Sequence, residues 1–196
     1  MDVAIQFFSS TEIAEAMALA KSTRKPVLID YWASNCKGCA KMKAVTYEDA
    51  EVQAYLQEHY VVVKCHIDTV SREFVKQYMT HAVLWAPSLF VYAPDGTILR
   101  TIIGYVSPRR FITDLSIGAA ALQMRQGKHA AALKLLGELP YAATYPELDQ
   151  EAMYWEGVAA FWAYQRNVDR LIPYWNRLRD TYPDSTWAEK ADVFPE

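Results

Sequence analysis

The stretch "DYWASNCKGCAKM", residues 30–42, places Cys36 and Cys39 directly after an apolar run. That run, "KPVLIDYWA" (25–33), is rich in β-forming residues and nearly continuous in its apolarity, which is typical of a strand buried on both faces. The segment that follows, "CAKMKAVTY" (39–47), has a helical pattern. The cysteine pair therefore lies where a strand turns into a helix. It can be a redox dithiol, half of a metal site, or two thiols that pack in a core.

The start of a helix is a favourable place for a reactive thiol. Backbone N–H groups there lack partners within the helix, and the positive end of the helix dipole lies close by. Both effects stabilise a thiolate at Cys36, and the cation of Lys37 acts in the same direction. Cys39, one helical turn further on, can attack a mixed disulfide formed at Cys36 and release the product. The spacing suits two-step exchange, with Cys36 as nucleophile and Cys39 as resolving thiol.

Strands and helices alternate along the first part of the chain. Ser9 and Glu12 form a capping box that opens a helix, and Pro94-Asp95-Gly96 predicts a hairpin between two β runs. The order β-α-β-α-β-α-β-β-α predicts an α/β layer architecture. Strands are expected at 3–8, 25–33, 60–68 and on both sides of the hairpin, with helices between them and from Pro108 to about residue 126.

From about residue 116 the pattern becomes purely helical. Residues 118–140 and 148–185 hold no strand-like alternation and are punctuated by glycine, proline and asparagine. We therefore expect two domains, 1–115 and 116–196, the second an all-α domain of helical hairpins. The helix from Pro108 bridges them.

Part of the second domain keeps the spacing of a tetratricopeptide repeat. "GKHAAALKLLGEL" (127–139) is similar to the second helix of a weaker preceding repeat. The aromatic residues can form a core, which we favour for most of them, or a surface that binds a partner protein. The positions that carry the spacing are Trp155, Val158, Ala159, Trp162, Leu171, Trp175 and Pro183.

Composition narrows the function classes. Apolar residues make up 52% of the 196 residues and the net charge is −3, which argues for a folded chain without a basic surface for nucleic acid. No apolar run reaches the roughly 18 residues of a membrane span. Three cysteines, an odd and low number, are typical of a cytosolic protein. The start has no leader pattern, so we expect a cytoplasmic location, or an exported one if a signal was removed.

The segment "VLIDYWASNCKGC" (27–39) resembles the active-site segment of thioredoxins. The resemblance extends over roughly residues 20–115 and implies the three-layer α/β/α fold and thiol–disulfide oxidoreductase activity of that family. No cofactor is implied, since the electrons are held in the dithiol. Five positions besides the cysteines keep the register of the family: Asp30, Trp32, Lys64, Pro87 and Gly104.

The resemblance also implies roles for individual residues. Asp30 handles a proton of the resolving cysteine, and Lys64 tunes Asp30. The Ala86–Pro87 bond is expected to be cis, which leaves the Ala86 backbone free to pair with an extended substrate. Trp85 lines that substrate groove or simply packs.

The sequence departs from thioredoxins next to the cysteines. Asn35 stands where they have tryptophan, and Lys37-Gly38 stands where they have Gly-Pro. The segment after the pair is more similar to the thioredoxin-like domains of disulfide-exchange proteins. A better-stabilised thiolate favours the reduced form, so we expect a reduction potential above the roughly −270 mV of thioredoxin.

Two other functions stay open beside the oxidoreductase. A zinc site needs about four ligands, and the nearest candidates are His59, Cys65 and His66. Cys65 and His66 are neighbours on a predicted strand and point to opposite faces, so a metal-handling dithiol is disfavoured and Cys65 is expected to be a packed thiol. The other alternative is a redox-sensing adaptor that binds partners through its helical tail. The oxidoreductase would act on protein thiols or disulfides together with a reductant or oxidant protein.

Overall fold

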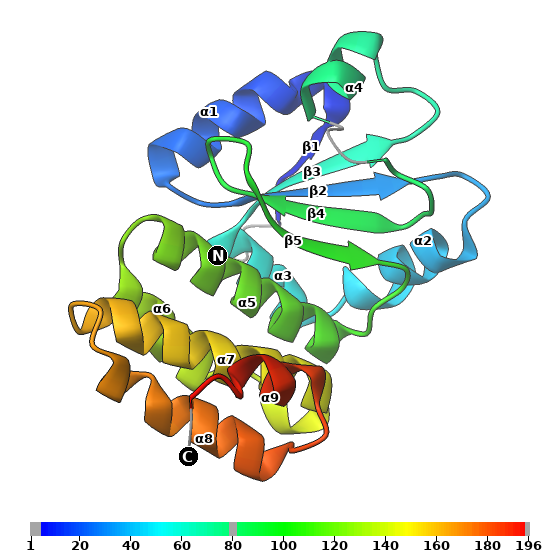
Figure 1. Ribbon diagram of the computed structural model, residues 1–196. Coiled ribbons are helices and arrows are strands. Elements are labelled where there is room, and N and C mark those ends of the chain that lie inside the picture. The colour runs from blue at the N-terminus through cyan, green and yellow to red at the C-terminus, as the bar shows by residue number, and fades with distance from the viewer. Residues whose placement is uncertain (1–4, 79–81, 195–196) are drawn as a thin grey trace. The chain divides into compact units, whose positions relative to one another are not determined.

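The computed structural model describes residues 5–78 and 82–194 and divides into two compact units, 1–112 and 113–196. The boundary between the two units falls inside helix α5 (Pro108–Arg125), and the expected division into domains 1–115 and 116–196 stays a prediction. In the part of the chain that the structure describes, the strands lie in the first unit and the second unit contains helices without strands (Figure 1). A mixed sheet with helices, followed by a helical region, confirms the predicted fold class.

The first unit is built on a five-stranded sheet with the strand order β1-β3-β2-β4-β5. The first three strands run parallel, whereas β4 pairs antiparallel with both β2 and β5. The predicted hairpin joins β4 to β5, and Gly96 in its turn has a φ of 86°, a conformation that glycine adopts without strain. The strands are β1 (Phe7–Ser9), β2 (Val27–Trp32), β3 (Val61–His66), β4 (Ser88–Tyr92) and β5 (Ile98–Ile103).

Both faces of the central strand β2 are covered, as its continuous apolarity predicts. Ile29 and Tyr31 belong to a core that also holds Ala16 of α1 and Phe74 of α4. Because side chains alternate along a strand, Asp30 points to the opposite face. The first-unit helices are η1 (Ser10–Glu12), α1 (Ile13–Thr23), α2 (Lys37–Lys41), the π-helical η2 (Met42–Thr46), α3 (Ala50–His59) and α4 (Arg72–Tyr78).

The second unit packs its helices against their neighbours in the chain. Trp175 is buried among aromatic rings, stacks on Tyr154 at 4.9 Å and donates its indole N–H to the Tyr154 carbonyl oxygen. Trp162 and Tyr164 remain 45% and 50% exposed. The tetratricopeptide-like repeat stays a prediction. After α5 come α6 (His129–Gly137), η3 (Ala142–Thr144), α7 (Pro146–Ala163), η4 (Val168–Arg170), α8 (Ile172–Thr181) and α9 (Thr186–Ala191).

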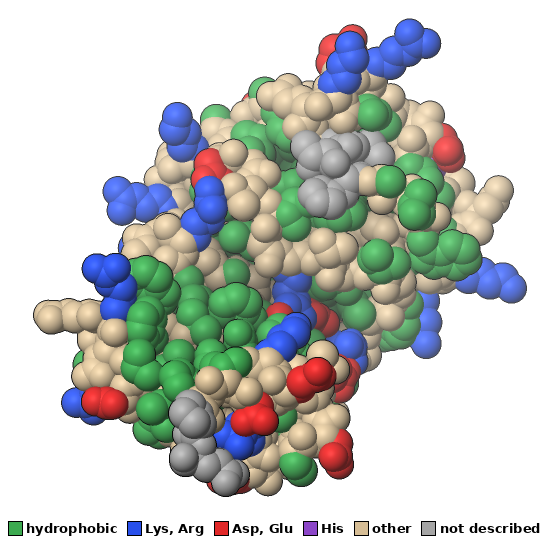
Figure 2. All heavy atoms as spheres, in the orientation of Figure 1, with side chains coloured by type: hydrophobic (Ala, Val, Ile, Leu, Met, Phe, Trp, Pro, Cys, Tyr) green, Lys and Arg blue, Asp and Glu red, His purple; other side chains and the backbone are tan. Residues whose placement is uncertain are grey.

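The surface carries charges of both signs. On the face drawn in Figure 2, Lys and Arg side chains are interspersed with Asp and Glu. Within residues 5–78 and 82–194, no helix is long and apolar enough to cross a membrane.

Candidate active site

The two cysteines are joined as a disulfide at the start of α2, with their Cα atoms 5.2 Å apart. Cys36 is the N-cap of the helix, and its sulfur accepts a hydrogen bond of 3.0 Å from the backbone N–H of Cys39. Cys36 is half-buried, whereas Cys39 is buried. An incoming sulfur can therefore reach Cys36 far more easily than Cys39.

The loop before β4 lies directly against the disulfide. The Ala86–Pro87 bond is cis, as the resemblance implies, and the Ala86 carbonyl oxygen lies 3.1 Å from the Cys36 sulfur. Gly38 approaches this loop so closely that a Cβ on it would lie 2.9 Å from Cδ of Pro87. The backbone N–H of Gly104 donates to the Pro87 carbonyl oxygen at 2.8 Å and ties the loop to the end of β5.

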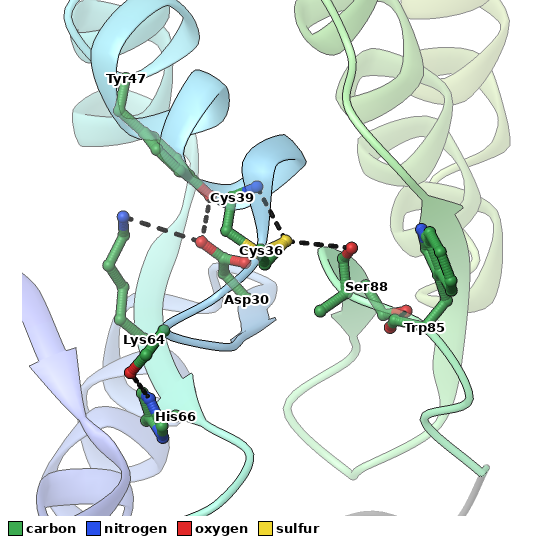
Figure 3. The surroundings of a disulfide bond; sticks show 10 residues. Asp30, Cys36, Cys39, Tyr47, Lys64, His66, Trp85 and Ser88 are labelled. Carbon is green, nitrogen blue, oxygen red and sulfur yellow. Dashed lines mark hydrogen bonds and ion pairs between the residues drawn. A yellow bond between two sulfur atoms is a disulfide. The ribbon is translucent and has the colours of Figure 1, made fainter.

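Asp30 and Lys64 are cross-strand neighbours on β2 and β3. Lys64 Nζ lies 3.7 Å from Asp30 Oδ2, and Figure 3 shows the carboxyl group pointing from β2 toward the helix that carries the disulfide. Burial raises the pKa of Asp30 above its ordinary value, and the Lys64 ammonium opposes that rise. Burial also lowers the pKa of Lys64, which the Asp30 charge opposes. A buried carboxyl with a raised pKa is suited to taking up and returning a proton.

Tyr47 is a site residue that the sequence reasoning missed. It is buried, and its hydroxyl donates a hydrogen bond of 2.9 Å to Asp30 Oδ2. The sequence held no local signal for it, because the π-helical turn η2 lies between Cys39 and Tyr47 and sets the direction of the Tyr47 side chain. The cation of Lys64 lies over the Tyr47 ring, 3.8 Å from its centroid.

His66, considered from the sequence only as a metal ligand, supports the loop before Cys36. Its Nδ1 accepts the backbone N–H of Asp68 at 3.3 Å, so in the neutral ring Nε2 carries the hydrogen. Nε2 lies 2.7 Å from Ser34 Oγ and donates to it. The ring packs edge-on against Trp32 at 4.4 Å between ring centroids. His66 thereby links the end of β3 to the cysteine loop.

A groove of about 630 Å³ opens over Cys36. Trp85, which is 69% exposed, lies on its wall, so the structure exposes this side chain rather than burying it. Leu84 next to it is 89% exposed. The groove is lined by residues 33–38, Asp68, Trp85, Ala86, Pro87 and Tyr105.

The candidate metal ligands proposed from the sequence do not form a metal site. Within the described residues there is no group of three or more His, Cys, Asp or Glu side chains that could hold a metal ion. Cys65 is fully buried and free, and burial raises the pKa of its thiol to about 12. Such a thiol is inert in exchange at neutral pH.

Comparison with known proteins finds similarity to redox domains. Residues 13–116 match the family described as "Thioredoxin-like domain". The thiol:disulfide interchange protein DsbD of Ralstonia nicotianae is 38% identical over 104 residues, which are 53% of this chain and 16% of that protein. DsbD of Neisseria meningitidis is 30% identical over 97 residues, 48% of this chain and 16% of that protein.

Solved structures are similar to part of the chain. The oxidised C-terminal domain of Neisseria meningitidis DsbD is 22% identical with a TM-score of 0.46, covering 54% of this chain and 93% of the domain. The curated relatives are much longer proteins, and the matched segment covers only 14% to 16% of their length.

Proposed function

The chain belongs to the thioredoxin-like domain family, and from that membership we propose that it is a thiol–disulfide oxidoreductase acting on protein substrates. The reaction uses the dithiol Cys36-Lys37-Gly38-Cys39. One observation carries the proposal: a half-buried sulfur at a helix start forms a disulfide with a buried sulfur one turn on. That asymmetry is what separates a nucleophile from a resolving thiol.

The exchange proceeds in two balanced steps. The Cys36 thiolate attacks one sulfur of a substrate disulfide, so that a mixed disulfide forms and the other substrate sulfur leaves as a thiolate. Cys39 then loses its proton and attacks Cys36 Sγ. The Cys36–Cys39 bond forms, the mixed disulfide breaks, and the substrate has gained two electrons. A dithiol protein restores the reduced pair, and the reverse sequence oxidises a substrate dithiol.

Asp30 is the proposed proton acceptor for the resolving step. Its raised pKa and its orientation toward α2 support this role. Lys64, 3.7 Å from the carboxylate, stabilises the ionised form and keeps Asp30 available as a base.

The groove over Cys36 is the proposed substrate site. An extended chain next to Ala86 would pair with its backbone, while the exposed ring of Trp85 would cover an apolar side chain beside the substrate cysteine. The adjacent Leu84 enlarges the apolar surface on offer.

The reduction of insulin by dithiothreitol tests the proposed activity. The wild-type protein should accelerate it, and Cys36→Ser should abolish the acceleration. Reduced Cys39→Ser, mixed with insulin after dithiothreitol has been removed, should accumulate a mixed disulfide visible on a non-reducing gel. Cys65→Ser serves as the control, because this buried thiol takes no part in the reaction. Acceleration by Cys36→Ser equal to that of the wild type would exclude the proposal.

A role of the helical unit in holding protein clients is the second candidate. Its support is a pair of exposed aromatic residues, with Arg166 beside the Trp162 ring and Arg170 beside the Tyr164 ring. The double variant Trp162→Ser/Tyr164→Ser should raise the KM for a protein disulfide and leave that for a small disulfide unchanged. Equal changes in both KM values would contradict it.

The cytoplasmic location expected from the cysteine count is a separate proposal, with an exported compartment as its alternative. Cell fractionation of the tagged, full-length protein in its source organism decides between them.

A further inference from the structure

The two oxygens of the Asp30 carboxyl group have different surroundings. Oδ2 accepts the Tyr47 hydroxyl at 2.9 Å and lies 3.7 Å from Lys64 Nζ. Oδ1 is buried and has no hydrogen-bond partner among the residues that the structure describes. A buried polar atom without a partner is costly and is often retained for chemistry.

The position of Tyr47 is fixed by its backbone and by packing of its ring. It follows the π-helical turn η2, and its backbone N–H donates to the Met42 carbonyl oxygen five residues back. The side-chain amide of Gln53 donates to the Tyr47 carbonyl oxygen at 2.8 Å. The ring packs edge-on against Phe7 and Phe111 at 5.8 and 5.9 Å. A π-helical turn of this kind often occurs at functional sites.

The Tyr47 hydroxyl remains a donor throughout the physiological range. Burial raises the pKa of Tyr47 well above its ordinary value, and the negative charge of Asp30 raises it further. A hydrogen bond from a neutral hydroxyl to a carboxylate favours the ionised form of the carboxylate.

We propose that Tyr47 is a positioning residue of the exchange reaction: its hydroxyl holds Oδ2 of Asp30 and leaves Oδ1 as the oxygen that takes the proton of Cys39. This inference rests on the proposed oxidoreductase function. The resolving step then transfers one proton, from the Cys39 thiol to Oδ1, while the Cys36–Cys39 bond forms and the substrate sulfur leaves as a thiolate.

Two groups contribute to the titration of Asp30: the Tyr47 hydroxyl at the end of η2 and the Lys64 ammonium on β3. The cysteine pair lies at the start of α2, and Cys65 of β3 packs in the core on the opposite face of the sheet. Lys43 on η2 acts on Lys64 as a like charge. Removal of the Tyr47 hydroxyl alone should raise the pKa of Asp30 further, because one hydrogen-bond donor fewer then opposes the effect of burial.

Tyr47→Phe isolates the hydroxyl, because phenylalanine keeps the ring and its face toward Lys64. The reduced protein is mixed with 5,5′-dithiobis(2-nitrobenzoate), and release of the second thionitrobenzoate reports the resolving step. In the variant that rate should fall about tenfold at pH 6, as expected for the loss of a hydrogen bond to a charged group, and should approach the wild-type rate at high pH. Tyr182→Phe, which removes a hydroxyl donated to Asp149 in the second unit, is the matched control.

A direct titration gives a second readout. The carboxyl carbon of Asp30, followed by NMR in the oxidised proteins, should titrate at higher pH in Tyr47→Phe than in the wild type. Coincident pH profiles and coincident titrations would overturn the inference, as would a rate reduced equally at every pH. A wild-type protein that never releases the second thionitrobenzoate would instead refute the proposed function.

Discussion

The charge on Cys36 in the reduced protein is set by neighbours that act in opposite directions. The backbone N–H of Cys39, 3.0 Å from the sulfur, and the nearby cation of Lys37 favour a thiolate. The Ala86 carbonyl oxygen, 3.1 Å away, presents its negative end to the same sulfur. Thioredoxins have Gly-Pro between the two cysteines and so lack a cation at the position of Lys37. We therefore expect the thiolate form of Cys36 to be more stable here than in thioredoxins.

The reduction potential of the Cys36–Cys39 couple should consequently lie above the roughly −270 mV of thioredoxin, because a stabilised thiolate favours the reduced form. Equilibration with glutathione buffers measures it. Lys37→Gln should lower the potential, and Lys43→Gln on η2 is the control cation. A wild-type value at or below that of thioredoxin would refute the argument.

Gly38 owes its identity to the ring of Pro87. In a helix, alanine in place of glycine would stabilise by about 1 kcal/mol. The Cβ of Gly38→Ala would lie 2.9 Å from Cδ of a rigid proline ring, so we expect a net loss of about 1–3 kcal/mol in the free energy of unfolding. Urea denaturation of the oxidised protein measures it, with Lys37→Ala on the exposed side of α2 for comparison. Increased stability in Gly38→Ala would show that the loop before β4 shifts to accommodate the added methyl group without an energetic penalty.

The imidazole of His66 at the end of β3 donates a hydrogen bond to Ser34 in the loop before α2. His66→Asn retains an acceptor near the Nδ1 position for the Asp68 N–H but loses the donor to Ser34. We expect the KM for a protein disulfide to rise several-fold while the kcat changes less, because the groove wall loses its support. A double-mutant cycle of His66→Asn with Ser34→Ala should give a coupling energy of about 0.5–1.5 kcal/mol in the free energy of unfolding.

The control for that cycle is His59→Asn, whose imidazole lies at the end of α3. Additive effects of His66→Asn and Ser34→Ala would mean that the two side chains do not act as a pair.

Features encoded within a few residues were predictable from the sequence. The Ser9–Glu12 capping box, the hairpin at residues 94–96 and the helix from Pro108 all form as expected, since each depends on local backbone chemistry. The parallel strands β2 and β3 were recognisable because burial on both faces leaves a continuous apolar run.

Features that depend on distant contacts were not predictable in the same way. The helical periodicity after Cys39 gave no sign of the π-helical turn that orients Tyr47 toward Asp30. The bond between Ser34 and His66 joins residues 32 apart, and no local pattern indicates it. The tertiary structure of the first unit decides both.

Asp30 lowers the stability of the whole molecule at neutral pH. Its pKa is raised in the folded protein, so above the ordinary aspartate range the native state binds more protons than the unfolded state. By linkage, the contribution of Asp30 to stability is complete at acidic pH, below the unfolded pKa, and is lost as the pH rises through the folded pKa. The ionised form that the reaction requires is thus the form that the fold tolerates least.

Asp30→Asn should therefore raise the melting temperature of the oxidised protein by a few degrees at pH 7 and by less at pH 4, where a larger fraction of the wild-type carboxyl is protonated. The amide oxygen can still accept the Tyr47 hydroxyl, so the substitution removes mainly the charge. Asp49→Asn, at the half-buried N-cap of α3, is the control and should show no such gain, since Asp49 accepts two backbone N–H groups. Calorimetry across this pH range measures both. If Asp30→Asn were destabilised at pH 7, the ion pair with Lys64 would outweigh the cost of burying the carboxylate, and the proton would have to leave Cys39 by another route.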